Sequence, residues 1–112
     1  MKKAKNAAGA YVLPKISSIE AAAQLVKGAK IPANNKISLT NPPASKKYRN
    51  AWPISTFTYV IVATSSPKAA QIKAFVKFAL SARAQKAIQP YVFAPMPSSV
   101  VTAANKTLAS IH

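Results

Sequence analysis

The longest β-type run in the chain is residues 52–62, WPISTFTYVIV, in which β-branched and aromatic side chains dominate and glycine is absent. Its one proline, Pro53, stands near the start, where a strand tolerates a residue that lacks a backbone N–H. Hydroxyl and ring side chains alternate loosely over the first half, whereas Tyr59–Val62 are largely apolar on both faces. This pattern is typical of a central strand that is covered on both faces at its C-terminal end. We therefore predict one long central strand here.

Helices are predicted after this run, and they are the elements expected to cover it. Ser65–Pro67 is typical of a helix start, because hydroxyl side chains precede a proline at the first helical position. The apolar residues of that helix have the spacing of one buried face: Ile72, Phe75, Val76, Ala79 and Leu80. Residues 81–89 continue or restart helically. After an irregular apolar segment, Ser98 or Ser99 is expected to cap a last helix.

Upstream of the run, one short strand and one helix are predicted. Ala10–Pro14 is the strand candidate, and the helix covers Ser18–Lys27. Ser17 and Glu20 have the spacing of a capping box, in which each side chain would satisfy the backbone amide of the other. Gly28 is expected to end the helix.

The middle of the chain is predicted to contain a turn, a strand and a loop. The turn is Ile31–Asn35, the second short strand is Lys36–Thr40, and the loop is the proline-containing, basic stretch Asn41–Trp52. Together these elements predict an α/β fold with short strands and one long central strand covered by C-terminal helices.

Charge is the unusual property of this composition. The 112 residues include sixteen Lys and Arg but a single acid, which gives a formal net charge of +15. Such a charge favours binding to polyanions, for example nucleic acid or an anionic membrane surface. The cations are scattered, except for Lys2-Lys3-Lys5 and Lys46-Lys47-Arg49, and arginine, which specific base readout favours, is scarce. We therefore expect no specific nucleic-acid partner.

The residues that catalysis and metal binding require are almost absent. Glu20 is the single acid, His112 is the single histidine, and there is no cysteine. A pair of carboxylates, a catalytic triad and a zinc or calcium site cannot be assembled from this set. We expect no enzyme activity, no metal and no cofactor. The serine pairs 17–18, 65–66 and 98–99 are expected to cap their helices rather than to bind an anion.

The N-terminus begins with basic residues, as a signal peptide does. No unbroken apolar stretch of about 7–15 residues follows, so no signal peptide is expected in this chain. No run approaches the roughly 20 apolar residues of a membrane-spanning helix.

The order of the segments nevertheless resembles a known family. These segments are AAGAYVLPKISSIEAAA, KIPANNKISLTNPPAS, AWPISTFTYVIV, SSPKAAQIKAFVKFAL and FAPMPSSVVTAANKTLASI. They are similar to the C-terminal part of the phosphate-binding protein of bacterial phosphate ABC transporters, over about residues 7–111. The most specific pieces are Trp52–Thr56 and Ala94–Val101.

The resemblance implies part of a type II periplasmic-binding-protein fold, in which two α/β lobes joined by hinge strands hold phosphate between them. Residues 1–50 would belong to the second lobe, and residues 51–112 would supply the hinge-proximal strand and the C-terminal helices of the first lobe. Phosphate, the transporter permease and the missing N-terminal lobe segments would be the partners, in the periplasm or at the cell surface. The family's phosphate ligands come mostly from earlier parts of the chain, so no ligand residue is assigned here.

Two other hypotheses remain open from the sequence. The chain could be a small basic protein that binds nucleic acid or another polyanion, because of its charge. It could also be a non-functional truncated remnant, which would expose the apolar surface that the missing segments normally cover.

Overall fold

A short antiparallel hairpin begins the chain in the computed structural model, which describes residues 1–112. Strand β1 (Ala4–Lys5) pairs with β2 (Tyr11–Val12), so that Lys5 lies opposite Tyr11. The connecting turn uses Gly9 at a φ of +80°, a conformation that glycine adopts without strain. The predicted strand at residues 10–14 is thus confirmed by β2.

The predicted helix after the hairpin is confirmed, but its cap is not the predicted one. Helix α1 (Ile16–Ala23) continues into the 3₁₀ turn η1 (Gln24–Val26). The Ser18 hydroxyl, rather than Ser17, accepts a hydrogen bond from the Lys15 amide at 2.9 Å. The helix begins two residues earlier than predicted, and this places Ser18 three residues after the N-cap Lys15, where its hydroxyl can reach back to the Lys15 amide. Gly28 follows at a φ of +78°.

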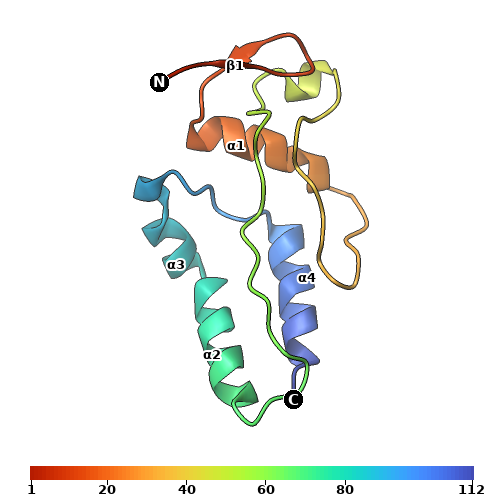
Figure 1. Cartoon of the computed structure of the whole chain (residues 1–112), viewed down its shortest axis with the longest axis vertical. Helices are drawn as coiled ribbons and strands as arrows, with labels where there is room; N and C mark the ends of the chain where they lie inside the picture. The colour runs from red at the N-terminus through yellow and green to blue at the C-terminus, as the bar shows by residue number, and fades with distance from the viewer.

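The C-terminal half is helical, as predicted. It contains α2 (Ala69–Ala79), α3 (Ala82–Ala87), the 3₁₀ turn η3 (Gln89–Tyr91) and α4 (Ser98–Ala109). Figure 1 shows α2 and α4 side by side at the end of the molecule that carries the C-terminus, with α3 above α2, toward the level of α1. None of these helices is both long and apolar enough to cross a membrane.

The predicted central strand does not form. Residues 55–63 have no regular secondary structure, and they run as an extended segment from the region of α1 toward the C-terminus (Figure 1). We call residues 54–63 the extended segment. None of its ten amides donates a hydrogen bond to the protein. The prediction of a covered strand was wrong, because no second strand lies along it and Ile61 is 95% exposed.

The second predicted strand, Lys36–Thr40, is also absent, although it lies beside the extended segment. The Asn41 amide donates to the Pro53 carbonyl at 2.7 Å, and the Thr40 hydroxyl lies 3.4 Å from the Ser55 carbonyl. Farther along, only the Tyr59 hydroxyl reaches Ile37. The two segments therefore run antiparallel, as two paired strands would, but one backbone bond does not make a ladder.

The hydrophobic core is small and lies between α1, the start of α4 and the connecting segments. Only 13 of the 112 residues are buried. The central cluster is Ala23, Val26, Leu39 and Val100, with Leu25, Ile31, Ile37, Phe57 and Met96 packed around it. Helix α2 has no fully buried residue. Of its predicted buried face, Ile72, Val76, Ala79 and Leu80 are half-buried and Phe75 is 65% exposed, so the predicted face is covered only in part.

The molecule is more open than a folded protein of its mass. Its accessible surface is 7801 Å², whereas about 5,900 Å² is typical of 11.8 kDa. The radius of gyration is 15.5 Å, against about 13 Å for a compact chain of this length. The fold is therefore a mixture of helices and a small antiparallel sheet, with apolar surface that the chain itself does not cover.

Candidate functional site

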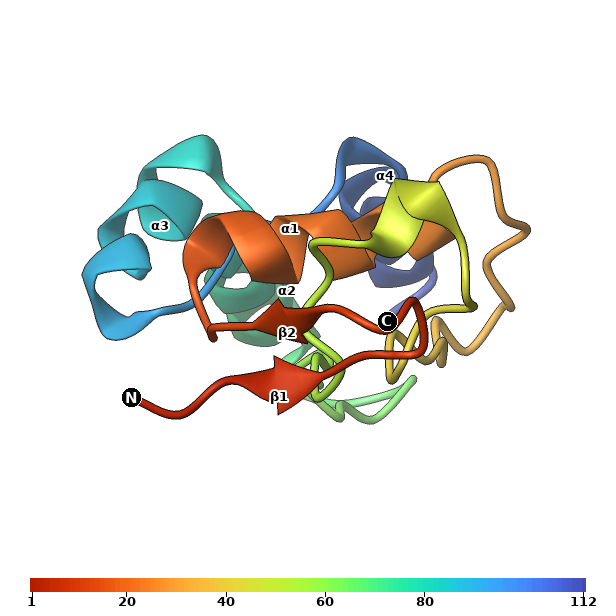
Figure 2. The same cartoon turned by 90° about the horizontal axis from the view of Figure 1, so that it is seen from above.

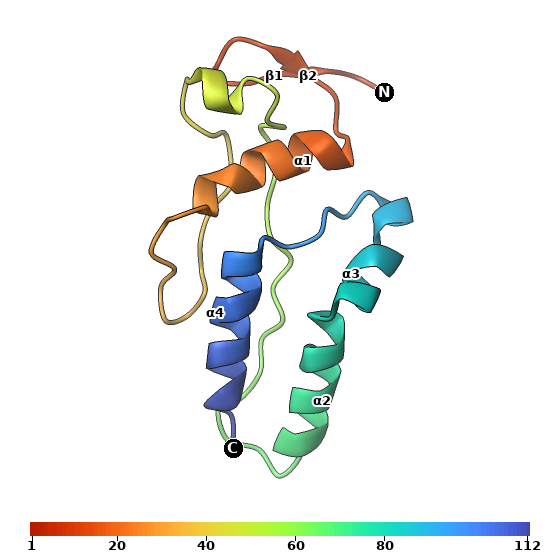
Figure 3. The ribbon, with the colours of Figure 1, turned by 180° about the vertical axis from the view of Figure 1, so that it is seen from behind.

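The groups that could carry acid–base or metal chemistry are not brought together. Glu20 lies exposed on α1, and His112 ends the chain beyond α4, at the far end of the molecule (Figure 3). No group of three or more His, Cys, Asp or Glu side chains is present that could hold a metal ion. The His112 backbone instead bonds to Thr64 and Ser66, which fastens the C-terminus to the start of the α2 region.

The serine pairs at the helix starts behave differently from one another. Ser18 caps α1, and the Ser66 hydroxyl accepts from the Lys68 amide at 3.1 Å, just before α2. Helix α2 begins at Ala69, so Pro67 precedes the helix instead of occupying its first position. No side chain caps α4, whose N-cap is Pro97, so the predicted cap by Ser98 or Ser99 was wrong. Helix α3, by contrast, has a serine cap, because the Ser81 hydroxyl accepts a hydrogen bond from the Ala84 amide.

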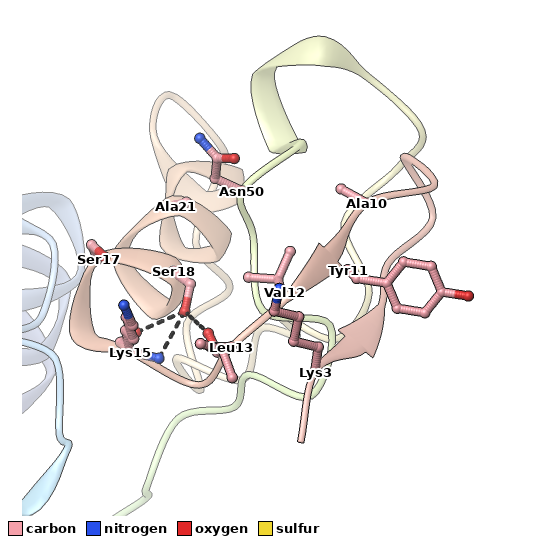
Figure 4. A pocket seen from close by; sticks show the side chains of 10 residues that line it. All are labelled: Lys3, Ala10, Tyr11, Val12, Leu13, Lys15, Ser17, Ser18, Ala21 and Asn50. Carbon is pink, nitrogen blue, oxygen red and sulfur yellow. Dashed lines mark hydrogen bonds between the residues drawn. The ribbon is translucent and has the colours of Figure 1, made fainter. Parts of the chain in front are cut away.

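A depression of about 400 Å³ lies between the hairpin and the start of α1 (Figure 4). Its polar side chains come from Lys3, Lys15, Ser17, Ser18 and Asn50. The Ser18 hydroxyl is occupied by the backbone of Leu13 and Lys15, as the dashed lines in Figure 4 show. Every buried side-chain polar atom of the chain has a hydrogen-bond partner. The depression is therefore an open, basic surface without an unsatisfied group that would mark a ligand.

Asn6 joins two parts of the chain that are distant in sequence. Its side chain is 6% exposed, and its amide nitrogen lies 2.9 Å from the Arg49 carbonyl and 3.0 Å from the Ala51 carbonyl. Its side-chain oxygen accepts from the Ala10 amide at 3.0 Å. Asn6 thus closes the turn of the hairpin and also fixes the loop that contains the 3₁₀ turn η2 (Lys46–Tyr48).

This connection brings both basic clusters of the sequence to one end of the molecule. Figures 1 and 2 show β1 and η2 together at the end that carries the N-terminus. We call this surface the basic end, and its six cations are Lys2, Lys3, Lys5, Lys46, Lys47 and Arg49. All six are exposed, and the chain has no acid other than Glu20 with which they could pair. Neighbouring cations without carboxylates create a strong positive potential.

Exposed apolar side chains lie elsewhere, on α2 and along the extended segment. Phe75 and Phe78 on α2 are 65% and 57% exposed, and Val60 and Ile61 are exposed on the extended segment. The sequence predicted burial for Phe75, Val60 and Ile61, and it made no prediction for Phe78. The predicted burial of these three residues was wrong, because no other part of the chain covers them.

Comparison with known proteins adds no assignment. No protein-family model matches the chain. No solved structure matches it either.

Proposed function

We propose that this chain is the C-terminal segment of an extracytoplasmic phosphate-binding receptor for ABC-transporter uptake, and that it supplies scaffold and hinge rather than ligand contacts. The proposal includes the finer fold, a partial type II periplasmic-binding-protein fold with residues 1–50 in one lobe and residues 51–112 returning to the other. The segment order that resembles this family is its starting point. The missing N-terminal lobe segments, phosphate and the permease are its proposed partners.

One observation carries the proposal: the extended segment has strand composition but no strand neighbours. Its ten amides donate no hydrogen bond within the chain, and its apolar side chains are largely exposed. These amides are unpaired within the chain, and a β-type run acquires ladder partners when adjacent strands are added. The accessible surface is larger than that of a compact protein of this mass, and the Phe75 and Phe78 side chains of α2 are mostly exposed. Both properties are consistent with a chain that packs against further polypeptide.

Isothermal titration with phosphate at physiological salt tests the location of the binding site. We expect no saturable binding by this chain alone, because it carries no assigned ligand residue. Binding should appear when the N-terminal segments of a phosphate receptor are added as a second polypeptide, and sulfate serves as the control anion. Saturable micromolar binding by the isolated chain would contradict the proposed location of the site.

Val60→Pro tests the strand pairing directly. The Val60 amide donates no hydrogen bond in the chain, so the substitution should leave the isolated chain almost unchanged. In a completed sheet it would remove one ladder bond, which weakens association with the second polypeptide by about tenfold or more. Val60→Ala, which keeps the amide, is the matched control. Equal association by both variants would exclude pairing at this position.

The second candidate function is binding of a polyanion, and the basic end is the observation that favours it. Duplex DNA binding with a steep salt dependence that disappears on neutralising the basic end would support this alternative. A salt dependence that is the same whichever lysines are removed would indicate net charge alone. A truncated remnant without function is the third reading, and sharp cooperative melting as a monomer would argue against it.

A further inference from the structure

The basic end is an assembled surface, although its two halves are far apart in the sequence. The β1–β2 hairpin carries Lys2, Lys3 and Lys5, and the loop around η2 carries Lys46, Lys47 and Arg49. Asn6 holds the halves together through its bonds to the Arg49 and Ala51 carbonyls, and the Ala7 amide adds a bond to the Asn41 side chain at 3.1 Å. The fold therefore holds like charges together, at a cost that an anionic partner surface would offset.

Aromatic and apolar groups are interleaved with these cations. Tyr11 lies directly opposite Lys5 in the hairpin, so both side chains stand on the same face of the sheet. Tyr11 is 66% exposed, and Figure 4 shows its ring projecting away from the hairpin and from Lys3. Met1 is 91% exposed at the same end. Lysine stems and tyrosine rings suit a boundary that is charged on the outside and apolar beneath.

The chemistry of the cations discriminates between possible polyanions. Five of the six are lysines, which act as flexible point charges, whereas geometric recognition of bases or of phosphate pairs favours the arginine fork. The regular elements at this end are two strands of two residues each and one 3₁₀ turn, which are shorter than the helix or two-stranded ribbon that a major groove accommodates. A flat array of mobile anions suits such a surface better than a duplex does.

We propose that the basic end docks this chain on an anionic lipid bilayer, with the phosphodiester headgroups as its ligands. Tyr11 and Met1 would enter the headgroup layer while the cations remain at its surface. The proposal rests on the placement of these residues and does not require the phosphate-receptor function. The proposal also fixes the orientation of the chain on the membrane: the hairpin and η2 face the bilayer, and α2 and α4 extend away from it (Figure 3).

Vesicle sedimentation with the full chain tests this. The probes are vesicles of phosphatidylcholine mixed with phosphatidylglycerol, and vesicles of phosphatidylcholine alone. Each cation near an anionic surface strengthens binding by about fivefold. The triple variant Lys46→Gln, Lys47→Gln, Arg49→Gln should therefore bind the anionic vesicles about a hundredfold more weakly than the unmodified chain.

The matched control is the triple variant Lys68→Gln, Lys77→Gln, Lys106→Gln, which has the same net charge but changes exposed lysines in or next to α2 and α4. We expect it to lose less than tenfold, and Tyr11→Ser to weaken binding to the anionic vesicles only. Equal losses by both triple variants would overturn the proposal, because net charge alone would then explain binding. Equal binding to neutral vesicles would overturn it as well. Tighter binding to a duplex oligonucleotide at the same salt, lost in the first triple variant, would reassign the surface to nucleic acid.

Discussion

At the scale of single residues, small polar side chains connect segments of the chain that share few buried apolar contacts. Asn6 and Ser18 are buried, and both bond to backbone groups. The Asn6 amide donates to the Arg49 and Ala51 carbonyls, and the Ser18 hydroxyl accepts from the Lys15 amide. Asn6 is the more consequential of the two, because its partners lie more than forty positions away in the sequence. No sequence motif marks Asn6, whereas a serine cap near residue 17 could be predicted from its position before a helix.

Asn6→Ala should destabilise the chain by about 2–3 kcal/mol, because it leaves buried carbonyls and an amide without partners. Urea unfolding monitored by the fluorescence of Trp52 measures this. The control is Asn105→Ala, which removes an exposed bond within α4 and should cost less than about 0.5 kcal/mol. Equal losses for the two variants would show that Asn6 does not join the hairpin to the loop.

At the scale of elements, the helices and the short strand β2 could be predicted from the sequence, whereas the strands predicted at residues 36–40 and 52–62 do not form. The pattern before α2 and α4, with hydroxyls and proline next to an amphipathic run, is local information, and local information is sufficient for a helix. A strand depends on a neighbour, and the composition of residues 52–62 predicted the strand without showing which residues would pair with it. Residues 36–41 and 53–59 lie antiparallel to each other, but the ladder is missing, so neither predicted strand forms.

Hydrogen exchange should separate these two classes of element. The amides of the extended segment are expected to exchange at nearly unprotected rates, because none of them donates a bond within the protein. Amides in the middle of α4 should be protected, since this helix contributes Val100 and Leu108 to the buried set. Exchange that is equally slow in both would show that the extended segment is paired in solution.

Helix α2 offers a second test at the same scale. Phe75→Ser together with Phe78→Ser should change the free energy of unfolding by less than about 0.5–1 kcal/mol, because both rings are mostly exposed. The same double substitution should increase solubility by removing an apolar patch. Val100→Ser, which places a hydroxyl in the core cluster, is the contrasting variant and should cost about 2 kcal/mol or more. A large loss for the phenylalanine variant would mean that α2 is packed more closely in solution.

At the scale of the whole molecule, a net charge of +15 acts on a fold with few buried residues. Like charges repel, and the compact state brings them closer together than the unfolded chain does. Only one carboxylate is present, so internal ion pairs cannot offset this repulsion. Stability should therefore depend strongly on ionic strength.

Raising sodium chloride from low to physiological concentration should raise the melting temperature of the chain, because salt screens repulsion beyond a Debye length of about 8 Å. Circular dichroism of the helices measures the transition. Potassium chloride should act as sodium chloride does, since the effect is one of screening. A melting temperature that falls with added salt would indicate that attractive charge pairs dominate instead.

The bare backbone of residues 58–64, TYVIVAT, has a consequence for how the protein can be handled. This seven-residue stretch contains no proline, glycine or charged residue. Apart from the Thr64 carbonyl, which accepts from the His112 amide, its backbone makes no hydrogen bond to other backbone groups of the chain. Identical copies could stack in register as a cross-β spine, with valine and isoleucine interleaved in a dry zipper. Repulsion between the cationic chains opposes such stacking, and added salt screens this repulsion. Concentrated samples at high ionic strength should therefore form fibrils that bind thioflavin. The substitution Ile61→Lys should prevent these fibrils, because it places a charge in the stacked segment.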